Sequence, residues 1–154
     1  MSEGWTLGCS GVSLAVRAGA ARPDIGSAEA LKAALLAATS VAHSRVGASG
    51  IHFSAVLERL GIADRLKKRV VVEKGPVGLA VARGEAELGV QQLCELLPVP
   101  GIDIVGPLPE GLQKLTCFAA GIPAVPADPR SAAALAAWLR SDEARAAMAA
   151  GGLH

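Results

Sequence analysis

The segment at residues 81–109 constrains the fold most, because helix and strand signals alternate there at short intervals. Gly84 ends one helix, an apolar strand follows at 87–91, and a short helical turn separates it from a second strand at 102–105. Such close alternation is typical of an α/β sheet. The rest of the chain must therefore supply further strands and the helices that cover them.

The same alternation extends over the whole chain. Apolar or β-branched runs predict further strands at 12–17, 39–43, 69–73 and 115–120, and Ala/Leu-rich text predicts helices at 28–38, 51–60, 76–83, 130–139 and 142–150. Ser27 is expected to cap the first of these helices. Strands that alternate with helices at this pace imply a parallel sheet with right-handed crossovers.

Composition excludes several classes of function. The 154 residues include 51% hydrophobic ones, which suffice for the core of one domain. Fifteen basic side chains face 14 acidic ones, so no net field favours a polyanion such as nucleic acid. Two Phe, two Trp and no Tyr leave few aromatic faces on which bases or sugar rings could stack.

Cysteine spacing and the N-terminus give expectations about redox state and location. Cys9, Cys94 and Cys117 are an odd number without a close pair, so we expect small buried apolar residues rather than disulfides or a metal site. Residues 1–6 lack the basic start and apolar middle of a secretory signal, and no run of 18 apolar residues exists. As written, the chain is expected in the cytoplasm.

Four pieces of the sequence carry a family resemblance: residues 12–25, 47–50, 81–101 and 106–109. Together they resemble the periplasmic molybdate-binding proteins, the type II solute-binding components of ABC importers, over nearly the whole chain. The resemblance implies a type II periplasmic-binding-protein fold, an α/β lobe with a mainly parallel sheet flanked by helices. In this fold the chain crosses twice between two lobes that enclose the ligand. Carried over, it makes 1–18 the first crossover strand, 19–112 a complete α/β binding lobe, and 113–154 the return strand and C-terminal helices of an incomplete lobe.

The resemblance also implies that the usual N-terminal half-lobe is absent. That half-lobe would cover apolar side chains of the C-terminal helices, namely Leu135, Trp138, Leu139 and Met148. Exposed apolar surface of this kind must be covered. We therefore expect a homo-oligomer, or a second chain that completes the protein, and an ABC permease is a further candidate partner.

A loop of small residues at 44–50 is the strongest candidate site. It opens a helix, where free backbone N–H groups and the helix dipole favour an anion. Ala48, Ser49 and Gly50 lie in it, and the resemblance places a backbone donor to a bound oxyanion at Ala48 and Ser49. The alternative is an ordinary glycine-rich helix start, in which Ser49 satisfies its own helix.

Two further candidates lie at the ends of strands or the starts of helices. The resemblance directs a backbone N–H near Val77 toward the ligand, although Pro76 also suits the first turn of any helix. Gln92 falls where molybdate binders carry a tyrosine hydroxyl. Adjacent glutamines, Gln91 and Gln92, are also compatible with a solvated strand end.

An enzyme needs other groups. His43, His52 or Glu95 could serve as the base of a proton shift beside a carboxylate, with residues 47–50 as the anion cradle. Arg45 could pair with the same anion or remain a solvated loop charge. No Ser-His-Asp arrangement, phosphate loop or metal-ligand cluster is recognisable, so no cofactor or metal is predicted.

Three functions remain open from the sequence. The first is a small-anion solute-binding protein whose ligand is an oxyanion such as molybdate or a carboxylate. The second is a truncated remnant that oligomerises without binding a ligand. The third is an isomerase of a small unsaturated polycarboxylate such as aconitate, since some relatives of this fold look recruited to that chemistry.

Overall fold

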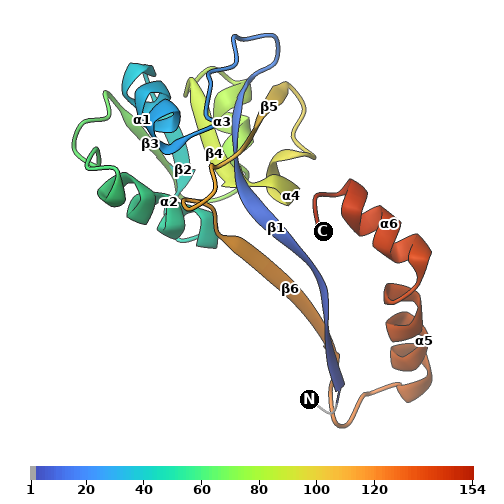
Figure 1. Ribbon diagram of the computed structural model, residues 1–154. Coiled ribbons are helices and arrows are strands. Elements are labelled where there is room, and N and C mark those ends of the chain that lie inside the picture. The colour runs from blue at the N-terminus through green and yellow to red at the C-terminus, as the bar shows by residue number, and fades with distance from the viewer. Residues whose placement is uncertain (1–2) are drawn as a thin grey trace. The chain divides into compact units, whose positions relative to one another are not determined.

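The middle of the chain folds as one compact unit, and its two ends come together in another (Figure 1). The computed structural model describes residues 3–154, so the first two residues of the 1–18 segment lie outside the described residues. Two compact units result. Unit 2 is Gly11–Lys114, and unit 1 combines the described residues before Gly11 with Leu115–His154.

The sheet of unit 2 is mixed rather than purely parallel. Its strands are β1 (Glu3–Arg17), β2 (Val41–Ser44), β3 (Arg69–Val72), β4 (Leu88–Gln92) and β5 (Ile102–Pro107), in the order β3-β2-β4-β1-β5. β2 pairs in parallel with β3 and β4, whereas β1 pairs antiparallel with β4 and β5. β1 is thus the exception in the expected, mainly parallel sheet, because this strand lies between β4 and β5 in the opposite direction. The predicted α/β class is confirmed.

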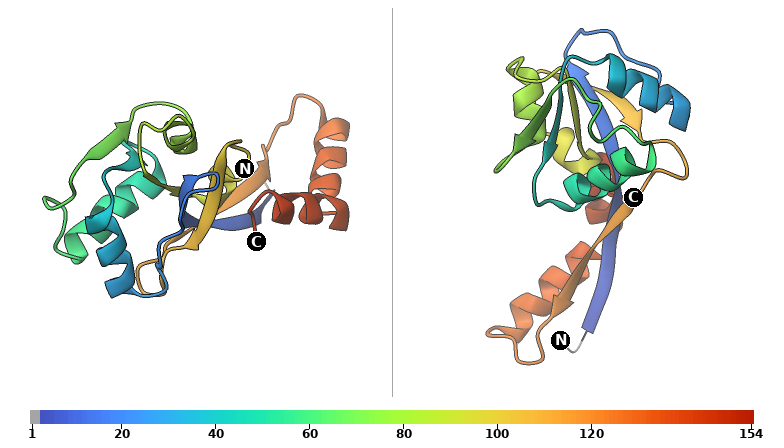
Figure 2. Two further views of the ribbon diagram at one scale, coloured as in Figure 1. Left: turned by 90° about the horizontal axis from the view of Figure 1, so that it is seen from above. Right: turned by 90° about the vertical axis from the view of Figure 1, so that its left-hand side faces the viewer.

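Helices cover both faces of this sheet. They are α1 (Ala28–Ala37), α2 (Ala48–Arg59), α3 (Val77–Ala82) and the short α4 (Leu93–Leu96). The views in Figure 2 place α1 and α3 on opposite sides. Leu35 of α1 and Phe53 of α2 are fully buried against Val90 of β4, while Val77 of α3 packs on Ala42 of β2. Alternation of side chains along each strand supplies both apolar faces.

The side chain of Gln113 joins the two ends of unit 2 through hydrogen bonds. The backbone N–H of Val12 donates to Oε1 of Gln113 at 2.8 Å, and Nε2 of Gln113 donates to the carbonyl oxygen of Val12, also at 2.8 Å. The glutamine amide thereby makes the paired hydrogen bonds that a neighbouring strand would make. The start and the end of unit 2 are fixed beside each other.

Unit 1 contains the first part of β1 together with β6 (Leu115–Ile122), α5 (Pro129–Leu139) and α6 (Asp142–Ala150). Asp128 caps α5 by accepting from the N–H groups of Arg130 and Ser131, and Ser141 caps α6. Arg140 lies over the Trp5 ring, 4.1 Å from its centroid, and forms an ion pair with Glu3. These contacts join α5 to β1.

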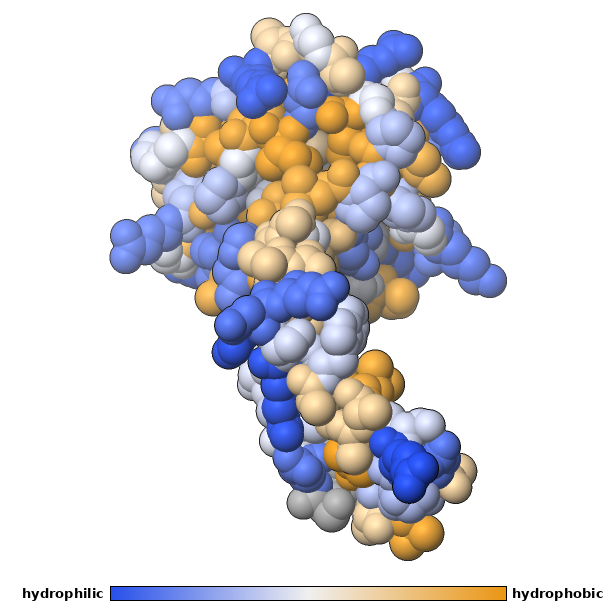
Figure 3. Space-filling model, turned by 90° about the vertical axis from the view of Figure 1, so that its right-hand side faces the viewer, coloured by the Kyte–Doolittle hydropathy of each residue, from blue (hydrophilic) through white to orange (hydrophobic). Residues whose placement is uncertain are grey.

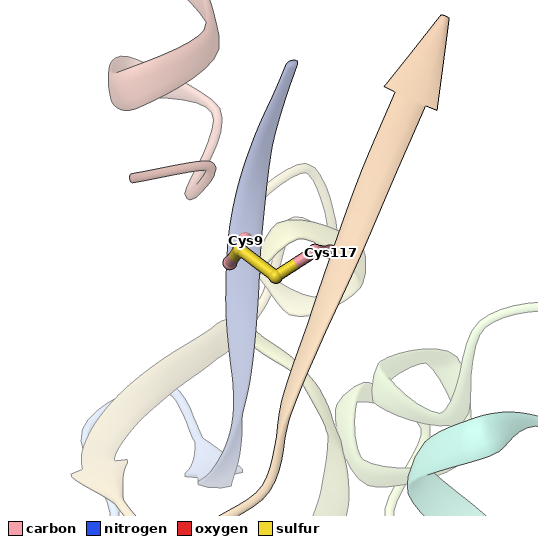
Figure 4. Close-up of a disulfide and its surroundings, with 2 residues drawn as sticks. All are labelled: Cys9 and Cys117. Atoms are coloured by element: carbon pink, nitrogen blue, oxygen red, sulfur yellow. A yellow bond between two sulfur atoms is a disulfide. The ribbon is translucent and has the colours of Figure 1, made fainter. Parts of the chain in front are cut away.

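A disulfide connects the two strands of unit 1. Cys9 of β1 and Cys117 of β6 are bonded through their sulfur atoms (Figure 4), and the residues are 108 positions apart. The expectation that all three cysteines are small buried apolar residues is therefore wrong. Cys117 is exposed, Cys9 is half-buried, and Cys94 is a half-buried thiol. On its other side, Cys9 exchanges two backbone hydrogen bonds with His154.

Apolar side chains remain on the surface of unit 1. Leu135 and Trp138 on α5 are 57% and 48% exposed, while Leu139 and Met148 are half-buried. Leu115 and Phe118 of β6 add further exposed apolar area. Within residues 3–154, no helix combines the length and the apolar character that crossing a bilayer requires.

Candidate functional site

The predicted binding residues meet at one edge of the sheet of unit 2. Because β2, β3 and β4 are parallel, their carboxyl ends share an edge, which is where α/β sheets place ligands. The loop before α2 follows β2, residues 73–76 follow β3, and Gln92 ends β4. The structure thus brings Ala48, Ser49, Val77 and Gln92 to the same edge.

The start of α2 offers unpaired backbone donors. Its N-cap, Gly47, has no side chain that could accept from them. In the part of the chain that the structure describes, no acceptor is hydrogen-bonded to the N–H groups of Ala48, Ser49 or Gly50. Ser49 and Gly50 are buried. A helix of 12 residues therefore presents its positive end at this edge.

Glycine is required where this loop turns back on β2. A Cβ atom on Gly50 would lie 1.9 Å from the carbonyl oxygen of Ser44, and one on Gly47 would lie 2.7 Å from its Oγ. Any side chain at Gly50 would have to displace backbone. The local sequence thus permits a turn tight enough to bring the first turn of α2 against the end of β2.

Two of the other candidate groups, the N–H of Val77 and the side chain of Arg45, are engaged within unit 2. The N–H of Val77 donates to Oε1 of Gln91 at 2.9 Å, so a ligand at this N–H would have to replace the Gln91 oxygen. Gln92 is 4% exposed. Nε of Arg45 donates to Oε1 of Glu73 at 2.6 Å, and both side chains are largely exposed. The charge of Arg45 is thus already compensated.

His43 is held as a neutral ring. It is 3% exposed, its Nδ1–H donates to the carbonyl oxygen of Ser44 at 2.9 Å, and its Nε2 accepts from Nη2 of Arg69 at 3.0 Å. Burial lowers the pKa of His43, and the Arg69 charge acts in the same direction although the bond to Ser44 opposes it. Both ring nitrogens are occupied, so His43 positions the end of β2.

His52 and Glu95 differ in their surroundings. Nε2 of His52 donates to the carbonyl oxygen of Leu112 at 2.6 Å, which ties α2 to the chain after β5. Glu95 lines a crevice between α3 and α4. Partial burial raises the pKa of Glu95, against the effect of a hydrogen bond from the backbone of Gln92. Glu95 thus combines a raised pKa with a place in the wall of a cavity.

From the sequence, Gln91 was a candidate but its hydrogen-bond partner was not predicted, and Arg69 was not named as a residue of the site. Arg69 pairs with a histidine 26 positions earlier, and Gln91 accepts from an N–H 14 positions earlier. The one available signal was the alternation of strand side chains, which places Gln91 and Gln92 on opposite faces of the sheet. Among residues 3–154, no group of three or more His, Cys, Asp or Glu side chains is arranged to hold a metal ion.

Comparisons with known proteins identify the family. The family model for bacterial extracellular solute-binding proteins matches residues 3–154. The chain belongs to this family. An aconitate isomerase from Pseudomonas sp. is 43% identical over 149 residues. That match covers 96% of this chain but 56% of the relative, so the chain spans little more than half of its length.

One solved structure has the same fold as this chain. It is the substrate-binding domain of a putative molybdenum ABC transporter from Clostridium difficile, with a TM-score of 0.73 and 17% identity. The match covers 97% of this chain and 65% of that chain. The mixed sheet flanked by helices is therefore the fold of periplasmic binding proteins.

Proposed function

We propose that unit 2 supplies one wall of a binding site for a small anion, an oxyanion such as molybdate or a carboxylate. The observation that carries this proposal is the start of α2, where the N–H groups of Ala48, Ser49 and Gly50 are unpaired at the carboxyl edge of the sheet. Backbone donors at a helix N-terminus bind anions without a counter-charge. This agrees with an edge at which Arg45 is already paired with Glu73.

We propose that further protein contributes to the second wall. The relatives are longer than this chain, and unit 1 exposes Leu135 and Trp138 of α5. We propose that further protein covers this face, either as a second copy of the chain or as a complementary half-lobe, and that an ABC permease receives the solute. The Cys9–Cys117 disulfide supports an oxidising compartment such as the periplasm, and not the cytoplasm expected from residues 1–6.

A substitution that removes one backbone donor tests the site. Proline at the first position of a helix has no N–H but leaves the helix intact. Gly47 already has φ −68° and ψ 154°, which a following proline favours. Ala48→Pro should therefore keep α2 folded and weaken anion binding about tenfold to a hundredfold, the loss of one hydrogen bond to a charged group.

Ala28→Pro is the matched control, because Ala28 is the first residue of α1 and the cap Ser27 bonds to Ala30 instead. Binding of molybdate and trans-aconitate would be measured by isothermal titration calorimetry on both variants and on the unaltered chain. Ala28→Pro should bind as the unaltered chain does. Equal affinity in all three proteins would refute the role of the α2 donors, and no binding to either anion would refute the proposed function.

A second candidate is an isomerase, favoured by the 43% identity to an aconitate isomerase. Such a reaction removes a proton from one carbon and returns one at another while the double bond shifts, with no net change in composition. Glu95 is the proposed base, since it lines the crevice while both nitrogens of His43 are occupied. Interconversion of cis- and trans-aconitate should disappear in Glu95→Gln, and turnover that survives would exclude Glu95.

A further inference from the structure

A crevice between α3 and α4 opens at the same edge of unit 2 as the anion loop. Its volume is about 510 Å³, within the range of roughly 300–1,000 Å³ that is usual for small-molecule sites. Its walls are mainly apolar and rigid: Leu79 and Val99 face it together with three prolines, Pro76, Pro98 and Pro100. Figure 3 shows apolar surface gathered on this side of unit 2.

One buried polar group faces this apolar lining. Gln91 lines the crevice and is 5% exposed. Its Oε1 accepts from the N–H of Val77, which fixes the orientation of the amide. Its Nε2 donates to no acceptor within residues 3–154 and remains accessible to solvent. The crevice thus contains a fixed donor without a partner.

The register of the sheet places this donor beside the anion loop. His43 of β2 lies opposite Val90 of β4 in a parallel pair, so Ser44 and Gln91 follow at the next position on neighbouring strands. Such strands are about 4.8 Å apart. The loop that begins at Ser44 and the crevice that begins at Gln91 are therefore adjacent.

We propose that this crevice binds the hydrocarbon part of an organic carboxylic acid, with a ligand oxygen accepting from Nε2 of Gln91. This inference rests on the proposed function, because the α2 donors hold the carboxylate. An inorganic oxyanion has no apolar part to fill walls such as Leu79 and Val99. The ligand class is therefore organic acids rather than molybdate.

The length of the ligand provides the first test. Acetate, butanoate and hexanoate carry the same charge but increasing hydrocarbon, and the ¹⁵N-labelled chain can be titrated with each by NMR. Each methylene that enters the crevice should tighten binding about fourfold. The side-chain NH₂ signals of Gln91 and the amide signals of Leu79 and Val99 should shift with the longer acids.

A filled crevice provides the second test. Leu79 is half-buried in the wall, so Leu79→Trp should occupy the space, remove the dependence on chain length and leave acetate binding unchanged. Leu97→Trp is the control, because Leu97 is 44% exposed and does not line the crevice. It should retain the dependence on length.

The outcomes separate the two proposals. Equal affinity for all three acids, with shifts at Ala48 and Ser49 but none at Gln91, would overturn the crevice and leave the anion site standing. No response to any acid at either place would overturn carboxylate binding itself, and the crevice assignment with it. Hexanoate binding that is as strong in Leu79→Trp as in the unaltered chain would also overturn the crevice.

Discussion

Breaking the Cys9–Cys117 disulfide should destabilise unit 2, although neither cysteine belongs to it. The whole of Gly11–Lys114 lies between the two cysteines, so the bond closes a loop around this unit when it unfolds. For a separation of 108 residues, the loop-entropy relation gives about 4.8 kcal/mol at 25 °C. Because measured effects are typically lower, we expect a loss of about 2–5 kcal/mol.

Unit 1 should lose less from the same change. While unit 2 is folded, Val12 and Gln113 already hold its ends together, so the disulfide closes only the few residues that lie outside them. The chain entropy at stake grows with loop length and is therefore smaller when unit 1 alone unfolds. The perturbation is Cys117→Ser or reduction with a phosphine, and Cys94→Ser, which keeps the disulfide, is the control.

Two assays distinguish the units. Both tryptophans, Trp5 and Trp138, lie in unit 1, so fluorescence during urea unfolding follows that unit. Hydrogen exchange of the fully buried strand β4 follows unit 2. We expect the exchange-derived free energy of β4 to fall by the larger amount. Identical exchange of β4 in oxidised and reduced protein would refute this account of the disulfide.

Three further predictions follow from the site. Burial lowers the pKa of His43, so below about pH 6.5 the unfolded chain takes up a proton that the folded chain does not. The free energy of unfolding should therefore fall by up to about 1.4 kcal/mol for each pH unit as the pH drops below about 6.5. His43→Gln should flatten this dependence in urea titrations between pH 7.5 and 5. Gly50→Ala should abolish anion binding in calorimetry and lower the melting temperature, because the added Cβ would lie 1.9 Å from the carbonyl oxygen of Ser44. Gly151→Ala is the control: its Cβ would make ordinary contacts from 3.4 Å, so binding and melting temperature should stay unchanged. Glu95→Gln should strengthen carboxylate binding severalfold at pH 7, because it removes a negative charge from the crevice. Unchanged affinity would show that the Glu95 carboxylate does not face the bound ligand.

Much of the fold was predictable because its signals are local. Ser27 caps α1 as expected, the two C-terminal helices lie within one residue of their predicted ends, and the strands after Gly84 were located within two residues. The start of β1 was missed. Residues 3–10 contain Gly4 and Gly8 and no apolar run, and they become a strand because β6 pairs with them from more than 100 positions away.

The candidate site was less predictable for the same reason. The anion loop could be located from Gly47 and Gly50, since small residues before a helix are a local signal. The pairing of His43 with Arg69 depends on the register of two parallel strands, which no spacing reveals. Cys9 and Cys117 likewise find each other only through β1 and β6.

The bonds between Gln113 and Val12 have a consequence for how such lobes spread among proteins. The Gln113 amide hydrogen-bonds to Val12 as a neighbouring strand would, so the first and last residues of the lobe lie beside each other. A protein that receives this lobe as an insertion therefore needs only two adjacent connection points. We expect residues 11–114 to behave as a cassette that tolerates transplantation into a foreign loop and accepts new termini elsewhere on its surface. Recombination at two nearby joints would then be enough to exchange one ligand-binding wall for another.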